Sequence, residues 1–223
     1  MCKGRLFVSV NLSLLLALLA ASLIACLPWQ RPPEGTLIYT GPTERSIPAG
    51  AFLPGTDIRY VGMTDQGAEL LIGDQRAVKK KGDSLDWDGH PLPGVTLNLR
   101  LRIIWFTEEK LHAAGTARLA IEEPQPAAMP FPEELPVIYK LPVSYNVERG
   151  ETIPSTTVSY VGASEKGAEL SGVEGYPYRK IADSILWEGK LLEGVFLKLT
   201  VRVVFFDEEQ LQVAGLATIG MRP

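Results

Sequence analysis

A strict alternation of apolar and polar residues runs from Val95 to Arg102, and an apolar stretch continues it to Phe106. Because successive side chains of a β-strand point to opposite faces, this period of two predicts a long strand with one buried face. A short acidic loop and a second arm, 111–121, complete a predicted β-hairpin. Its first arm is expected to point inward at the odd-numbered positions Val95, Leu97, Leu99, Leu101, Ile103 and Trp105.

The same pattern returns 100 residues later, with Val195 to Phe206 as the first arm of a second hairpin. Aligning residues 37–123 with 137–223 requires no gap and gives 31 identical pairs among 87. Twelve-residue strands span about 40 Å, and strands of that length normally bend to serve two sheets or coil into a barrel. The sequence therefore predicts an all-β fold, with two tandem homologous small β-barrel or β-sandwich domains.

Each copy is expected to hold about seven strands, and turn residues predict where they end. Gly115 and Gly215, midway along the return arms, indicate a bulge or bend. Four consecutive apolar residues at 103–106, and again at 203–206, predict burial on both faces near the hairpin tips. In the first copy we expect strands at 36–40, 57–64, 68–72, 76–80 and 83–87, an irregular segment at 41–55, and a turn at Asp88-Gly89.

The N-terminus begins with Lys3 and Arg5, continues with an apolar run from Leu6 to Ala25, and reaches Cys26. Leu23 to Cys26 resembles the lipobox of bacterial lipoproteins, and the resemblance implies cleavage before Cys26 and its lipidation. The alternative is an uncleaved membrane helix, since about 20 apolar residues can span a bilayer. The expected organisation is a signal segment (1–26), a Pro-rich tether (27–36), copy 1 (37–123), a Pro-rich linker (124–136) that cannot pair in a sheet, and copy 2 (137–223).

Charge and cysteine content exclude some classes of function. A net charge of −4 and a pI near 5.4 argue against a nucleic-acid partner, which requires a clustered basic surface. The basic run of Arg76 and Lys79 to Lys81 is typical of a guarded edge strand. Cys2 and Cys26 are the two cysteines, so the two copies contain no thiol that could act as a nucleophile or metal ligand.

The sequence contains no recognisable catalytic motif, and we expect no cofactor and no metal. His90 and His112 are replaced by Lys190 and Gln212 in copy 2 and are interpreted as surface residues. The acidic tips, Glu108-Glu109 and 207–209, are interpreted as soluble turns, with a short helical turn left open at the first. A hydrolase that uses Glu69, Asp83 or these tips is the enzymatic alternative.

Arg102 and Arg202 allow two interpretations. They either form ion pairs with Asp83/Asp183 or Glu69/Glu169, or anchor a ligand beside aromatic residues. The second interpretation gives the candidate ligand-binding set Tyr60, Trp87, Arg102, Tyr160, Trp187 and Arg202, with Cys26 as the lipid attachment site. We therefore expect a non-enzymatic binding module anchored outside the cytoplasm on a bacterial membrane, with a glycan, a cell-wall polymer or an envelope protein as partner. A purely structural spacer is the remaining alternative.

Overall fold

The computed structural model describes residues 35–223, so the predictions for the signal segment, for Cys26 and for most of the tether lie outside the described part. Residues 35–223 are all-β, as the alternation predicts, and contain no helix. No helix in this range is therefore long and apolar enough to cross a membrane.

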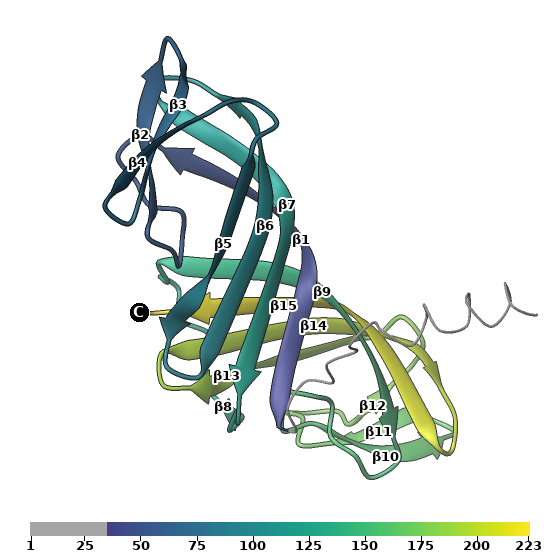
Figure 1. The fold of residues 1–223 in the computed structure, drawn as a ribbon. Helices are drawn as coiled ribbons and strands as arrows, with labels where there is room; N and C mark the ends of the chain where they lie inside the picture. The colour runs from purple at the N-terminus through teal and green to yellow at the C-terminus, as the bar shows by residue number, and fades with distance from the viewer. Residues whose placement is uncertain (1–34) are drawn as a thin grey trace, which may run out of the picture. The chain divides into compact units, whose positions relative to one another are not determined.

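The first repeat (37–123) contains a long sheet and a small one (Figure 1). The long sheet has the order β1-β7-β6-β5, and the small sheet has the order β2-β3-β4; all pairs are antiparallel. The strands are β1 (Thr36–Pro48), β2 (Ile58–Thr64), β3 (Gly67–Ile72), β4 (Gln75–Lys79), β5 (Ser84–Leu92), β6 (Val95–Phe106) and β7 (Lys110–Glu122).

The second repeat (137–223) has the same topology, and one additional strand from the preceding linker, β8, joins the edge of its long sheet. The long sheet has the order β8-β13-β14-β15-β9 and the small one β10-β11-β12. Each sheet is open, so the arrangement is sandwich-like rather than a closed barrel. The strands are β8 (Ala127–Ala128), β9 (Val137–Glu148), β10 (Ser159–Ser164), β11 (Gly167–Ser171), β12 (Tyr178–Arg179), β13 (Ser184–Leu192), β14 (Val195–Phe206) and β15 (Gln210–Met221).

The inward face of the long hairpins is confirmed up to Ile103 and Val203, whose odd-numbered neighbours are all buried. A bulge then shifts the register at Ile104 and Val204. Because an extra residue reverses the alternation, Trp105 and Phe205 point outward, and Phe106 and Phe206 pack against the core instead. The prediction of an inward Trp105 is therefore wrong. Burial on both faces is also wrong, since Ile104 and Val204 are exposed.

Two further local predictions are wrong. Residues 41–48 are not irregular but continue β1, because an edge strand tolerates Pro42 and Pro48. The chain does not turn at Asp88-Gly89; β5 passes through it and turns at Pro93-Gly94. Gly89 remains in the strand because the Trp87 ring lies where a Cβ would be.

The two repeats contact one another through β1 and β9, which cross in Figure 1. We call this contact the seam. The Tyr39 hydroxyl hydrogen-bonds the Ser155 hydroxyl, and the Tyr139 hydroxyl donates to the carbonyl of Pro54 at 2.9 Å. Each repeat thus inserts its first tyrosine into the loop after the first strand of the other. Burial raises the pKa of Tyr139 to about 12, so the ring stays neutral in the folded protein.

The seam also contains a half-buried cation, Arg45, that has no counterpart in the second repeat. Arg45 lies 4.1 Å from the centroid of the Tyr139 ring and donates to the carbonyl of Ile138 at 2.9 Å. One hydrophobic cluster includes buried residues from both repeats, and the described residues form one compact unit. The division into two tandem domains stays a prediction, although the seam shows that each repeat covers part of the other.

The linker 124–136 pairs with the sheet, so its expected role as an unpaired spacer is wrong. Ala127 and Ala128 form β8, opposite Lys190 and Gly189 of β13. The Gln125 N–H donates to the carbonyl of Leu191 at 2.8 Å, and the Met129 N–H donates to that of Glu188 at 3.1 Å. Its prolines do not prevent this pairing, because β8 lies at an edge and the prolines flank the paired residues.

Candidate functional site

The repeats differ most in the third strand of the small sheet. In the first repeat β4 pairs with β3 over five positions, whereas β12 pairs with β11 at only two. Pro177 has no N–H to give to the ladder, and Gly172 and Gly175 have φ angles of 73° and 77°, which turn the chain into a loop. The loop 172–177 therefore replaces most of a strand and leaves space beside the sheet.

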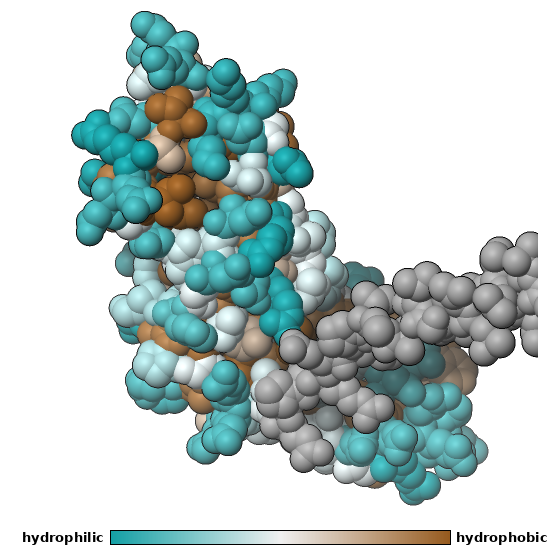
Figure 2. All heavy atoms as spheres, in the orientation of Figure 1, coloured by the Kyte–Doolittle hydropathy of each residue, from teal (hydrophilic) through white to brown (hydrophobic). Residues whose placement is uncertain are grey.

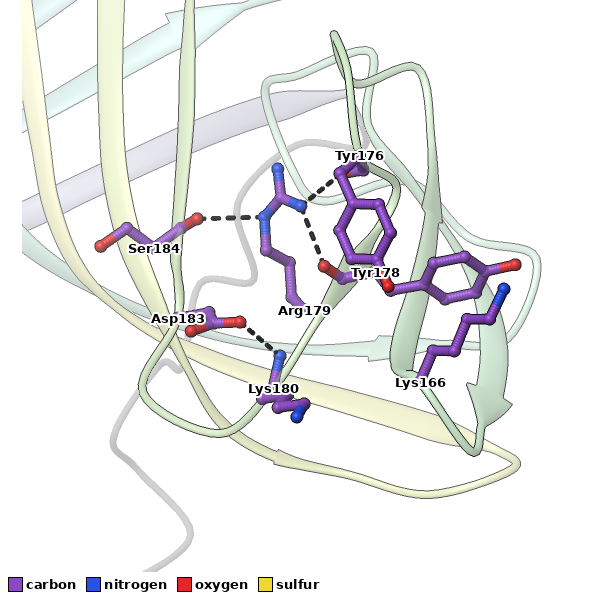
Figure 3. Close-up of a pocket in the computed structure, with 7 residues that line it drawn as sticks. All are labelled: Lys166, Tyr176, Tyr178, Arg179, Lys180, Asp183 and Ser184. Carbon is purple, nitrogen blue, oxygen red and sulfur yellow. Dashed lines mark hydrogen bonds between the residues drawn. The ribbon is translucent and has the colours of Figure 1, made fainter.

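This space is an open depression of about 400 Å³, drawn in Figure 3. Its lining combines two tyrosines with several charged groups. Tyr176 is 63% exposed, and its ring meets that of Tyr178 edge to face with 5.4 Å between centroids. The lining residues are Lys166, Tyr176, Tyr178, Arg179, Lys180, Asp183 and Ser184. We call them the tyrosine site.

Arg179 holds the loop in place. Its guanidinium donates through Nη1 to the carbonyls of Tyr176 and Tyr178, and through Nε to the carbonyl of Ser184 at 3.2 Å. These bonds tie the loop to the start of β13 (Figure 3). The first repeat has Lys79 at this position, and a lysine ammonium cannot reach three carbonyls in this fork-like manner.

The turn that carries Asp183 at the site has the same hydrogen bond as the equivalent turn of the first repeat. The Asp183 carboxylate accepts the N–H of Lys180 at 2.7 Å, and Asp83 accepts that of Lys80 at the same distance. An aspartate in a turn commonly closes it by such a bond to backbone. The same turn thus lies beside a regular strand in the first repeat and beside the loop 172–177 in the second.

The charge of the tyrosine site is positive, although the protein as a whole carries −4. Lys166, Arg179 and Lys180 against Asp183 give three positive charges minus one negative, a local balance of +2. The Lys166 ammonium, from the turn between β10 and β11, lies 5.2 Å from the centroid of the Tyr178 ring. Aromatic faces beside cations can bind an anionic ligand with an apolar face.

The structure does not bring the sequence-predicted binding residues together. Tyr60 and Tyr160 have no exposed surface; their hydroxyls donate to the carbonyls of Thr107 and Asp207, and burial raises both pKa values. They join each small sheet to a hairpin tip. Neither ring can offer a face to a ligand.

The tryptophans and arginines of that set lie on opposite faces of the long sheets. Trp187 is buried and donates to Thr157, whereas the half-buried Trp87 donates to Asp57 at 2.7 Å. Arg102 and Arg202 are exposed on the outer face. Arg102 donates to the carbonyl of Gly82 at 2.9 Å and is not among the ion pairs of residues 35–223, so its predicted pairing with Asp83 or Glu69 is wrong.

The acidic residues considered for catalysis or metal binding have local partners. Glu69 pairs with Arg76, and Asp83 closes the turn described above. The Asp207 carboxylate accepts the N–H groups of Glu209 and Gln210, both at 2.9 Å, and these bonds lower its pKa. Within residues 35–223, no group of three or more histidine, cysteine, aspartate or glutamate residues is placed to hold a metal ion.

Sequence reasoning missed the tyrosine site because it searched among the residues that the two repeats share. The site could have been found from the residues that differ between the repeats. Positions 71–79 and 171–179 form the longest run of non-identical pairs in the alignment, nine in succession. No family model matches the chain, and neither does any curated protein or solved structure. The assignment of a function therefore depends on the geometry of this site.

Proposed function

We propose that the protein is a non-enzymatic binding module of the bacterial envelope, anchored outside the cytoplasm through Cys26, that binds an anionic glycan at the tyrosine site. The observation that carries the proposal is the pair Tyr176 and Tyr178 beside Lys166, formed where the second repeat departs from the first. Tyrosine combines an apolar ring with a hydroxyl, which suits the apolar face and polar rim of a sugar.

The depression is open rather than enclosed, and Figure 3 draws the side chains that line it. An open site is accessible to one unit of a long chain, whereas small-molecule sites usually bury most of their ligand. The positive charges of Lys166 and Lys180 favour sugars that carry carboxylate or phosphate groups. A polymer segment with such groups is therefore the ligand class that we propose.

Hydrophilic side chains also cover most of the corresponding end of the first repeat in Figure 2, with apolar patches between them. This surface has Arg76 and Val78 where the second repeat has the two tyrosines. The first repeat thus supplies a natural control for the proposed site, with the same scaffold and a different surface.

Calorimetric titration with uronic-acid oligomers and with neutral glucans of equal length tests this function. We expect the acidic oligomers to bind, and the double variant Tyr176→Ala/Tyr178→Ala to bind about tenfold more weakly because two ring contacts are lost. Added salt should weaken the binding of the acidic oligomers to the parent protein, because it screens the attraction between opposite charges. The control variant Arg76→Ala/Val78→Ala should bind like the parent. Equal binding of neutral and acidic oligomers would contradict the proposal, and release of shortened oligomers would favour the hydrolase alternative.

The proposed anchor has its own test. Cells that express the full chain should incorporate alkyne-palmitate into the protein, and Cys26→Ala should abolish both the label and the membrane attachment. One acyl chain anchors only marginally, so firm attachment is expected to depend on the two or three chains of a processed lipoprotein. Membrane attachment of Cys26→Ala without label would instead identify an uncleaved helix. Cys2→Ala is the matched control and should keep the label.

A further inference from the structure

The outer edge of the long sheet is covered by a strand in the second repeat, whereas no strand among residues 35–223 covers it in the first. In the second repeat, β8 and its flanking residues lie along β13 and bond to the carbonyls of Glu188 and Leu191. The Phe131 N–H also donates to the Glu188 carboxylate at 2.9 Å. In the first repeat β5 is the outermost strand, and among the described residues no strand pairs with its outer edge.

Burial along the two strands reflects this difference. Trp187, Gly189 and Leu191 of β13 are buried, whereas the equivalent Trp87, Gly89 and Pro91 of β5 are only half-buried. A Cβ on Gly189 would lie 2.5 Å from the carbonyl oxygen of Ala127, so the glycine leaves room for the covering strand. Gly89 leaves the same room, and the three heavy atoms nearest its Cβ position all belong to the Trp87 ring.

Proline at position 91 does not close this edge. The covering segment uses the carbonyl of Leu191, not its N–H, and Pro91 retains the carbonyl. The register of β5 shifts between Gly89 and Leu92, so His90 and Pro91 have no partner in the backbone register with β6, although the His90 ring lies 3.3 Å from the Thr96 hydroxyl. Within residues 35–223, no backbone group bonds to the outer edge of β5 at this point, and an unpaired edge strand readily accepts an incoming chain.

We propose that the outer edge of β5 binds an extended peptide segment of a partner protein by β-strand addition, as β13 binds residues 125–131 of its own chain. This site lies in the first repeat and is independent of the tyrosine site. Main-chain hydrogen bonds supply affinity in this mode, and the side chains facing the sheet supply specificity.

The sequence of the second repeat indicates which peptides fit. Ala127 and Ala128 lie opposite Lys190 and Gly189, so small residues are expected opposite His90 and Gly89. A Cβ on Gly220 would overlap Leu135 and lie 2.9 Å from the Phe131 ring; the first repeat has Ala120 there. The methyl group of Ala120 therefore excludes a bulky aromatic residue at the position that corresponds to Phe131.

A synthetic peptide with the sequence of residues 124–135 and the change Phe131→Ala is the probe, and the full-length protein is the binding partner. We expect saturable binding by calorimetry, with slower hydrogen exchange of residues 86–92 and unchanged exchange of residues 172–178. The peptide with phenylalanine retained should bind more weakly. N-methylation of the residue that corresponds to Met129 removes one donor without changing a side chain, and should weaken binding about tenfold.

Two variants of the protein locate the site. His90→Pro blocks the edge at a residue outside the backbone register of β5 and β6 and removes one exposed side-chain hydrogen bond to Thr96, so the fold should be retained and peptide binding should fall about tenfold. Pro91→Leu, which introduces the residue of the second repeat, should bind like the parent, and so should Tyr176→Ala/Tyr178→Ala. Absence of binding, or equal binding by His90→Pro and by the N-methylated peptide, would overturn the proposal. A dimer in which residues 86–92 are already protected would also overturn it, by assigning the edge to a second copy of the chain.

Discussion

Alanine in place of Gly115 is expected to lower the free energy of unfolding by about 3 kcal/mol, because β6 and β7 are too close at this point for any side chain. A Cβ on Gly115 would overlap the carbonyl oxygen of Arg100 and lie 2.9 Å from the Cα of Leu101. Both are backbone atoms, so neither can move aside as a flexible side chain would. Urea denaturation followed by circular dichroism measures the loss.

The control for this variant is Thr116→Ala, one residue along the same strand. Thr116 is exposed, and its replacement should change stability by no more than about 0.5 kcal/mol. Gly215→Ala should reproduce the effect of Gly115→Ala, because a Cβ there would lie 2.7 Å from the Cα of Val201. A Gly115→Ala protein as stable as the Thr116→Ala protein would show that the strands are further apart than described.

Removal of the Tyr39 ring is expected to destabilise the protein by about 3 to 5 kcal/mol, the usual loss for a fully buried aromatic residue. Tyr39 is 1% exposed and reaches across the seam to Ser155. Tyr39→Ala leaves a cavity between the repeats, whereas Tyr39→Phe removes only the hydroxyl and should cost about 1 kcal/mol. Urea denaturation of the two variants separates packing from hydrogen bonding.

Hydrogen exchange of Tyr39→Ala also shows how far the two repeats depend on one another. If the seam joins them into one cooperative unit, exchange should accelerate in β14 and β15 of the second repeat as well as in β6 and β7. Acceleration limited to the first repeat would contradict this expectation and would identify two independently stable domains.

The sequence predicted the long hairpins well because their burial repeats every second residue, as a strand with one buried face requires. The prediction failed where one extra residue in a bulge reverses the alternation of inward and outward side chains. The apolar run at 103–106 does not reveal the bulge at Ile104, which turns Trp105 outward. The prediction also failed where two turn signals competed, since Asp88-Gly89 and Pro93-Gly94 both favour a turn and only the second has an apolar pair, Leu92 and Val95, to close it.

The candidate site could not be predicted from the shared residues, and the reason is physical. Tyr60, Tyr160 and Trp187 occur in both repeats because each repeat must fill the same core, so their aromatic character reports packing. Tyr176 and Tyr178 have no counterparts, and the loop that carries them is held by Arg179. In a duplicated chain, the positions that differ are therefore the better guide to binding surfaces.

The reciprocal tyrosines of the seam resemble the contacts of a symmetric homodimer, in which the same patch serves both partners. In a true homodimer one gene encodes both subunits, so a new loop or a covered edge would arise twice. Here both partners belong to one polypeptide, and each position can mutate on its own. That freedom allows one member of the pair to gain a tyrosine-lined hollow while the other keeps a strand edge that no strand among residues 35–223 pairs with.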